Sequence, residues 1–110
     1  MPRRYPRVRV QLQELEVEVG PLGARSIRGV VLDISRGGMK VKLEREIPEL
    51  YLQGDYLVRF TESGGRVSPE IMLARVRRSE GNRQYAIEFR KPLEALEIEK
   101  EDLEAVGATV

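Results

Sequence analysis

The chain has 110 residues, of which 41% are hydrophobic, and this length suits one domain with a single modest core. It contains no cysteine, histidine or tryptophan, which excludes disulfides, thiolate nucleophiles, imidazole acid–base chemistry and Cys/His zinc sites and makes an enzyme a minority interpretation. The net charge is only +1, but the charges are distributed unevenly along the chain. Residues 1–9 contain four arginines and no acid, whereas residues 92–110 contain six acids and one lysine.

Alternating apolar and polar residues predict an antiparallel β-structure over most of the chain. The first long strand is expected over residues 8–19, with a kink near residues 13–14, where the alternation changes phase. A glycine-containing turn follows, and the apolar segment 26–34 predicts a second, largely buried strand. Four further strands are expected at residues 39–43, 56–60, 71–77 and 85–89. Six strands joined by short turns predict a six-stranded antiparallel β-barrel, because closure removes the exposed edges of a sheet.

The last part of the chain differs in composition. Beyond Pro92 it consists mainly of Glu, Leu, Ala and Lys, and its apolar residues fall near one helical face. This pattern predicts a helix over residues 94–106 that caps an open end of the barrel. The chain is expected to be a single domain, 1–110, made of a basic N-terminal arm (1–9), a β-barrel (8–91) and a C-terminal helix and tail (92–110). It has no apolar run long enough for a membrane span and no signal-peptide pattern, so a cytoplasmic protein is expected.

The N-terminal arm contains side chains suited to binding an anion. Arg3 and Arg7 stand four residues apart, with Arg4 between them. A planar guanidinium donates two hydrogen bonds at once, to a phosphate or to the O6 and N7 atoms of guanine. The localised charge favours a small anion, although the arm taken alone also fits a solvated basic tail.

A second candidate segment has the sequence DISRGG and lies at residues 33–38, between two predicted strands. Asp33 and Ser35 have the same strand parity, so their side chains are expected to emerge together, and the two glycines permit a tight turn or the close approach of a ligand. Taken alone, the segment also fits an ordinary loop in which Asp and Ser bond their own backbone.

Together the two segments resemble the PilZ domain family, whose signature is an RxxxR segment before the first barrel strand and a D/NxSxxG loop after it. Both halves are complete here, as Arg3-x-x-x-Arg7 and Asp33-x-Ser35-x-x-Gly38. The resemblance continues through the segments RVRV, GMKV, ARVRR and YAIEF. It implies a six-stranded barrel with a C-terminal helix that binds cyclic di-GMP, without catalytic activity, a metal or a cofactor.

The resemblance also implies how the ligand is held. Arg3 and Arg7 would contact phosphate oxygens and the Hoogsteen edges of the guanines. Asp33 would accept hydrogen bonds from N1–H and the N2 amine of guanine, which adenine does not offer. Ser35 would add a shorter polar contact, and Gly38 would leave room for the ring.

Two further arginines are expected to contribute to the same ligand site. Arg4 would add charge or reach a second ligand molecule, and Arg75, on the fifth predicted strand, would stack on a purine. Each of the two also fits a solvent-facing side chain.

The expected function is a cyclic di-GMP receptor whose arm becomes ordered on binding and relays the signal to a downstream effector protein, as a monomer or a ligand-bridged dimer. One alternative is a PilZ-like adaptor with weak or no nucleotide binding, against which the complete motifs argue. Another is a small barrel that binds RNA or single-stranded DNA. That function calls for aromatic stacking platforms and distributed basic charge, and four Tyr and two Phe give it little support.

Overall fold

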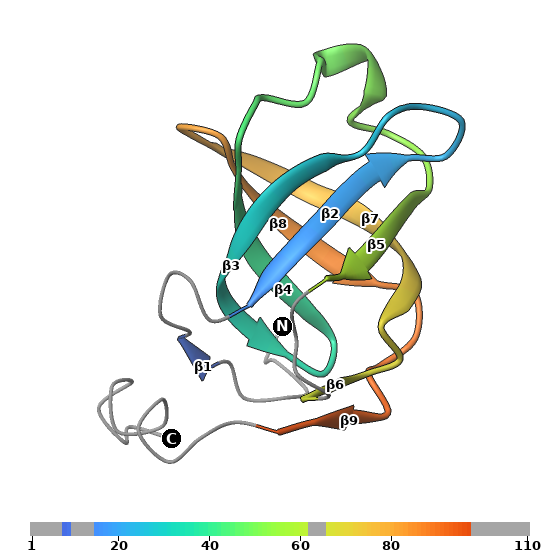
Figure 1. Ribbon diagram of the computed structural model, residues 1–110. Coiled ribbons are helices and arrows are strands. Elements are labelled where there is room, and N and C mark those ends of the chain that lie inside the picture. Colours follow the sequence, from blue (N-terminus) through green and yellow to red (C-terminus); the bar gives the residue numbers. More distant parts are fainter. Residues whose placement is uncertain (1–7, 10–14, 62–65, 98–110) are drawn as a thin grey trace.

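The computed structural model describes residues 8–9, 15–61 and 66–97 (Figure 1). Its strands are β1 (Val8–Arg9), β2 (Glu16–Pro21), β3 (Ile27–Ser35), β4 (Gly38–Leu43), β5 (Tyr56–Phe60), β6 (Val67–Ser68), β7 (Ile71–Gly81), β8 (Gln84–Phe89) and β9 (Ala95–Leu96). A 3₁₀ helix, η1 (Glu49–Tyr51), lies between β4 and β5. The regular secondary structure of the described residues is therefore all β apart from one 3₁₀ turn. Within it, no helix has the length and apolar character of a membrane span.

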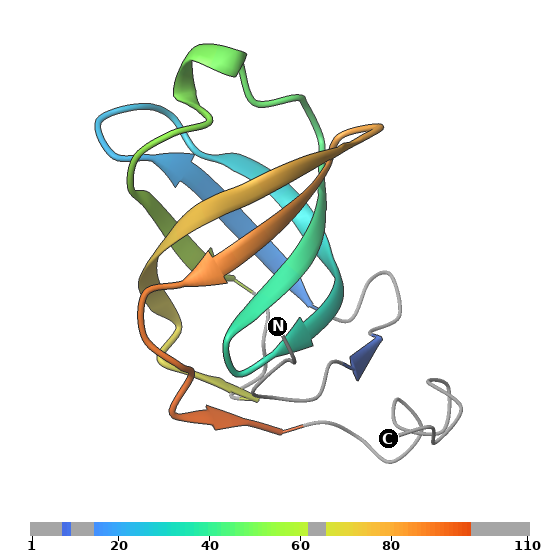
Figure 2. The ribbon, with the colours of Figure 1, turned by 180° about the vertical axis from the view of Figure 1, so that it is seen from behind.

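Six strands close into an antiparallel barrel (Figure 1 and Figure 2). Their order is β3-β2-β5-β7-β8-β4, and β4 pairs again with β3. Closure satisfies the backbone of both outer strands of this row, which would otherwise be exposed edges. The six-stranded barrel expected from the sequence is confirmed.

The barrel interior is filled by alternate residues of each strand. In β5, for example, Tyr56, Val58 and Phe60 are buried, whereas Leu57 and Arg59 are exposed. The ring of Phe60 meets that of Phe89 edge-on, with the centroids 6.2 Å apart. Other fully buried side chains are Val17, Val19, Val31, Ile34, Met39, Val41, Leu43, Ile87 and Leu93. The barrel is thus a packed core, as expected for its strand number.

Both β1 and β2 pair with β3, in agreement with one interrupted first strand. Arg9 pairs with Asp33 and Glu16 with Val30, so seven steps along the first strand correspond to three steps along β3. The difference of four residues arises between Arg9 and Glu16. The kink predicted at residues 13–14 falls in this interval, outside the described residues.

The C-terminal helix predicted over residues 94–106 is not found in the described part of the chain. Instead, β9 pairs with β6, and the N–H groups of Glu94 and Glu97 donate to the carbonyls of Ser68 and Arg66, both at 2.7 Å. Burial of Leu93 in the core brings the segment alongside β6, whose backbone groups offer pairing that overrides helix propensity. Residues 98–106 of the predicted helix lie outside the described residues.

The upper end of the barrel in Figure 1 carries the connection formed by residues 44–55. The Tyr85 hydroxyl accepts a hydrogen bond from the N–H of Ile47 at 2.8 Å, and the Tyr56 hydroxyl donates to the carbonyl of Tyr51. Burial, reinforced by the neighbouring Tyr85, raises the pKa of Tyr56 to about 12. We call this the tyrosine end. The opposite end, which holds the β3–β4 turn, β6 and β9, is called the turn end.

Candidate functional site

The predicted DISRGG segment comprises the end of β3, the turn and the first residue of β4. The register of β3 against β4 shifts between Val31 and Asp33, so Leu32 is an extra residue that forms a β-bulge. Val31 and Ile34 are both buried in the core. Because side chains alternate along a strand, the bulge turns Asp33 to the outer face of the barrel while Ile34 stays inside.

Ser35 fixes the shape of the turn. It is only 6% exposed and is the one buried polar side chain among the residues that the structure describes. Its Oγ accepts a hydrogen bond from the N–H of Gly37 at 3.3 Å and donates to the carbonyl of Gly38 at 3.4 Å. The hydroxyl is thus satisfied within the turn.

Gly38 is the first residue of β4 and pairs with Glu88 of β8. A Cβ atom at this position would be 2.5 Å from the carbonyl oxygen of Ile87 on β8. Gly29 on β3 shows the same restriction, because its Cβ would be 2.5 Å from the carbonyl of Lys42. Gly38 therefore has a packing role in the barrel that the sequence did not reveal. The role in leaving room for a ligand ring stays a prediction.

Asp33 begins a row of paired residues across four strands. It pairs with Lys40 of β4, which pairs with Ala86 of β8, which in turn pairs with Arg78 of β7. Asp33 and Lys40 are both half-buried. Since directly paired residues face the same side of a sheet, the outer face beside Asp33 carries a lysine and then an arginine.

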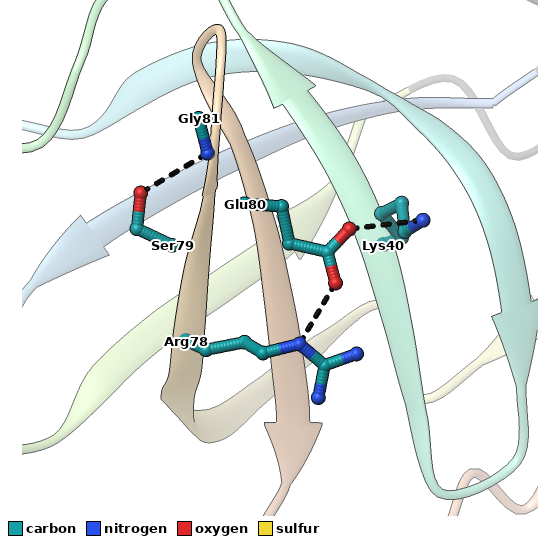
Figure 3. A network of polar contacts seen from close by, with 5 residues as sticks. All are labelled: Lys40, Arg78, Ser79, Glu80 and Gly81. Carbon is teal, nitrogen blue, oxygen red and sulfur yellow. Dashed lines mark hydrogen bonds and ion pairs between the residues drawn. The ribbon is translucent and has the colours of Figure 1, made fainter.

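Glu80 joins the two cations of this row (Figure 3). Its Oε1 is 2.9 Å from Nζ of Lys40, and its Oε2 is 2.9 Å from Nε of Arg78. Glu80 lies within a second bulge, where the register of β7 shifts between Ser79 and Gly81, and its side chain reaches across β8. The hydrogen bond from Lys40 holds the pKa of the Glu80 carboxyl below its usual value.

Sequence reasoning missed this network of Lys40, Arg78 and Glu80. The alternation over residues 39–43 does assign Lys40 to the wet face of its strand. The position of Glu80 has no such signal, because a bulge depends on the partner strand.

Arg75 is exposed on the outer face of β7, where its Nε is 2.7 Å from Oε1 of Glu88. Glu88 pairs with Gly38, and Gly38 pairs with Ser35, so Arg75 belongs to the row that ends at Ser35. Three strand spacings separate the two ends of this row, roughly 14 Å along the sheet. Arg75 thus shares a row with the turn but is too far from Ser35 for a direct contact.

The remaining predicted site residues are in the arm and lie outside the described residues; they are Arg3, Arg4 and Arg7. The chain enters the described structure at β1, where Val8 pairs with Ile34 and Arg9 with Asp33. The first described residues therefore run beside the last part of β3, next to the DISRGG turn.

The outer face beside the turn carries Asp33 and three cations, Lys40, Arg75 and Arg78, and each of these cations forms an ion pair with Glu80 or Glu88. Among the described residues, no group of acidic side chains could hold a metal ion. The Asp33 carboxylate can accept hydrogen bonds from a ligand, whereas the three cations can bind a ligand anion only by giving up their ion pairs.

Comparisons with known proteins agree with this architecture. A family model described as "PilZ domain" matches residues 2–105. Among solved structures, the Bacillus subtilis inhibitor of motility (MotI/DgrA) is similar, with a TM-score of 0.55 and 21% identity over 96% of this chain. The match covers 47% of that chain, so the present chain spans about half the length of that protein. No match was found among curated proteins.

Proposed function

The chain belongs to the PilZ domain family, and we propose that it is a receptor domain for cyclic di-GMP. The observation that carries the proposal is the pairing of β1 with the end of β3. Val8, the residue directly after the RxxxR motif, pairs with Ile34, the second residue of the D/NxSxxG motif. The chain directly after the first motif therefore lies beside the second motif at one end of the barrel, which supports a shared site.

In this proposal the arginines provide affinity and Asp33 provides selectivity. Arg3 and Arg7 bind phosphate oxygens and guanine Hoogsteen edges through paired guanidinium donors, and Arg4 adds charge. Asp33, which the bulge turns outward, accepts from N1–H and N2 of a guanine. An adenine in the same position would leave the carboxylate without these donors, at a cost in affinity.

Ser35, Gly38 and Arg75 have more indirect roles. The hydroxyl of Ser35 is bonded within the turn, so its main contribution is to hold Asp33 in place. Gly38 keeps the turn close to β8 and leaves the outer face free of a side chain. Arg75 stacks on a purine only after it gives up its ion pair with Glu88. Breaking this pair costs little free energy, because it is exposed to solvent.

Binding is proposed to act as a signal. The arm becomes ordered over the dinucleotide when its arginines meet the phosphates, and the changed surface is read by an effector protein. The receptor would work in the cytoplasm, as a monomer or as a dimer bridged by ligand.

Calorimetric titration with cyclic di-GMP tests the site. We expect Asp33→Ala and Arg7→Ala each to weaken binding by about 10–100-fold, since each loses hydrogen bonds to or from a charged group. Arg28→Ala is the matched control, because Arg28 is an exposed arginine on β3 remote from the turn, and its affinity should equal that of the wild type. Undiminished binding by both site variants would refute the assignment.

A competition experiment separates the receptor from the alternatives. Labelled cyclic di-GMP should stay bound in the presence of a random single-stranded oligonucleotide and be displaced by unlabelled cyclic di-GMP. Displacement by the oligonucleotide would identify a nucleic-acid binder, and absence of any binding of the label would identify an adaptor.

A further inference from the structure

A groove of about 570 Å³ lies at the turn end, between the start of β7 and the segment that follows β8. Figure 2 shows this segment descending from β8 to β9 beside the first residues of β7. The N–H of Arg90 donates to the carbonyl of Leu73 at 2.9 Å and keeps the two walls together. The apolar lining includes Met72, Leu73, Pro92 and Leu93. Its volume lies within the range of ligand-binding pockets, and its lining is mainly apolar, as in such pockets.

The charges around the groove are unequal. Arg36, Arg90 and Lys91 line it, against a single acid, Glu94. Arg90 is paired with Asp55, whereas Lys91 is exposed and forms no ion pair with any described residue. An occupant with negative charge is therefore favoured over a neutral or basic one.

An exposed apolar strip continues from the groove over the outer face of the barrel. Leu73, which lines the groove, pairs directly with Leu57 of β5, and Ile71 lies two residues before Leu73 on the same face. These three side chains are 44%, 40% and 50% exposed. Adjacent large apolar side chains on an outer sheet face, next to an apolar groove, are typical of a surface that contacts another protein.

We propose that the groove and this strip together form the docking surface for another protein, which contributes an amphipathic segment carrying acidic side chains. Apolar side chains of that segment fill the groove over Met72 and Leu73 and cover Leu57. Its carboxylates face Lys91 and Arg36. A small molecule could fill the groove but would leave the strip exposed, which is why a protein segment fits better.

The docking surface is joined to the DISRGG turn by hydrogen bonds. The Nε of Arg36 donates to the carbonyl of Leu93 at 2.8 Å, and the N–H of Leu93 donates to the carbonyl of Arg36 at 2.7 Å. In addition, the N–H of Phe89 donates to the carbonyl of Gly37 at 3.0 Å. A ligand that shifts the turn therefore shifts one wall of the groove. This coupling, unlike the docking surface itself, rests on the proposed function.

Selection of random displayed peptides on the full chain, without nucleotide, tests the docking surface. We expect the selected peptides to combine large apolar residues with Asp or Glu. Synthetic copies should bind Leu73→Ser about tenfold or more weakly than the wild type, as measured by fluorescence polarisation. Lys91→Glu should also weaken them, and exchange of the peptide's acids for lysine should restore binding to that variant.

Leu50→Ser is the matched control, because Leu50 is an even more exposed leucine, at 84%, located at the tyrosine end. It should bind the peptides as the wild type does. Thermal unfolding of each variant separates loss of binding from loss of folding. Failure to select any acidic amphipathic peptide, or equal binding by Leu73→Ser, would overturn the proposal. Self-association of the wild type that Leu73→Ser abolishes would overturn it too, because the occupant would then be a second copy.

The same peptides measured with saturating cyclic di-GMP test the coupling. We expect the nucleotide to change peptide affinity in the wild type and not in Asp33→Ala. Peptide binding without any nucleotide binding would leave the docking surface standing and refute the receptor function. Binding of both without mutual influence would refute only the coupling.

Discussion

The tyrosine end and the turn end of the barrel place their polar groups in opposite ways. At the tyrosine end, the hydroxyls of Tyr56 and Tyr85 reach from the core to the backbone of the 44–55 connection. At the turn end, a bulge at Leu32 turns Asp33 away from the core, and a groove opens beside Leu93. At the tyrosine end, polar side chains are used to hold a connection to the barrel, whereas at the turn end a polar side chain and a groove face outward.

The comparison is not absolute, because the turn end also contains residues needed for the fold. Gly38 belongs to the predicted binding motif, yet its backbone packs against the Ile87 carbonyl. The following changes test how far binding and stability are separated, beginning with the largest effect.

Gly38→Ala should lower the free energy of unfolding by about 3 kcal/mol, because the new methyl group meets a backbone carbonyl that cannot rotate away. Urea denaturation measures the loss. Gly29→Ala is the matched control, because Gly29 is a barrel glycine outside the motif whose Cβ atom would also lie 2.5 Å from a carbonyl oxygen. This variant should lose a similar free energy of unfolding. Full stability of Gly38→Ala would mean that this glycine serves the ligand alone.

Raising the pH should destabilise the tyrosine end. The folded-state pKa of Tyr56 is about 12, against 10.0 for an ordinary tyrosine, so the folded chain holds this proton more tightly than the unfolded chain does. The stabilisation of the folded state by this bound proton is complete below pH 10 and is lost as the pH rises to about 12. A difference of two pKa units corresponds to a loss on the order of 2–3 kcal/mol. Urea denaturation across this range should show a shallower fall for Tyr56→Phe; identical curves would contradict the prediction.

Tyr85→Phe should cost about 2 kcal/mol of stability, because it removes the hydroxyl that accepts the N–H of Ile47 in a buried environment. Thermal unfolding would detect the loss. Calorimetry should find the affinity for cyclic di-GMP unchanged, since Tyr85 belongs to the tyrosine end. A large loss of affinity would show that the two ends are coupled.

Glu80→Gln should have the smallest effect, about 0.5 kcal/mol at neutral pH, because the pairs with Lys40 and Arg78 lie on the outer face. The lowered pKa of Glu80 means that its contribution is present above the ordinary pKa of a glutamate and is lost as the pH falls through the folded-state value. Denaturation of both proteins at neutral and acidic pH should show the difference shrinking with acidity. A difference in the free energy of unfolding that grows in acid would show that the ionised Glu80 does not stabilise the fold.

Much of the barrel could be predicted because alternation is a local property. The strands expected at residues 39–43 and 56–60 agree with β4 and β5 to within one residue. The short strand β6 was missed, since two residues are too few to show a period. The helix expected from residue 94 was wrong where the structure describes it, because pairing of β9 with β6 depends on a contact between distant segments.

The candidate site divides in the same way. Its residue types and their spacing, from Arg3 and Arg7 to the DISRGG segment, are fixed by the sequence and were sufficient to identify the family. Only the tertiary structure decided which way Asp33 faces: without the extra residue at Leu32, Asp33 would share the parity of Val31 and point into the core. A bulge is a mismatch in register between two strands, so neither strand encodes it alone. The same holds for Glu80, for the contact of Gly38 with β8 and for the groove beside Leu93, each of which exists only once the barrel has closed.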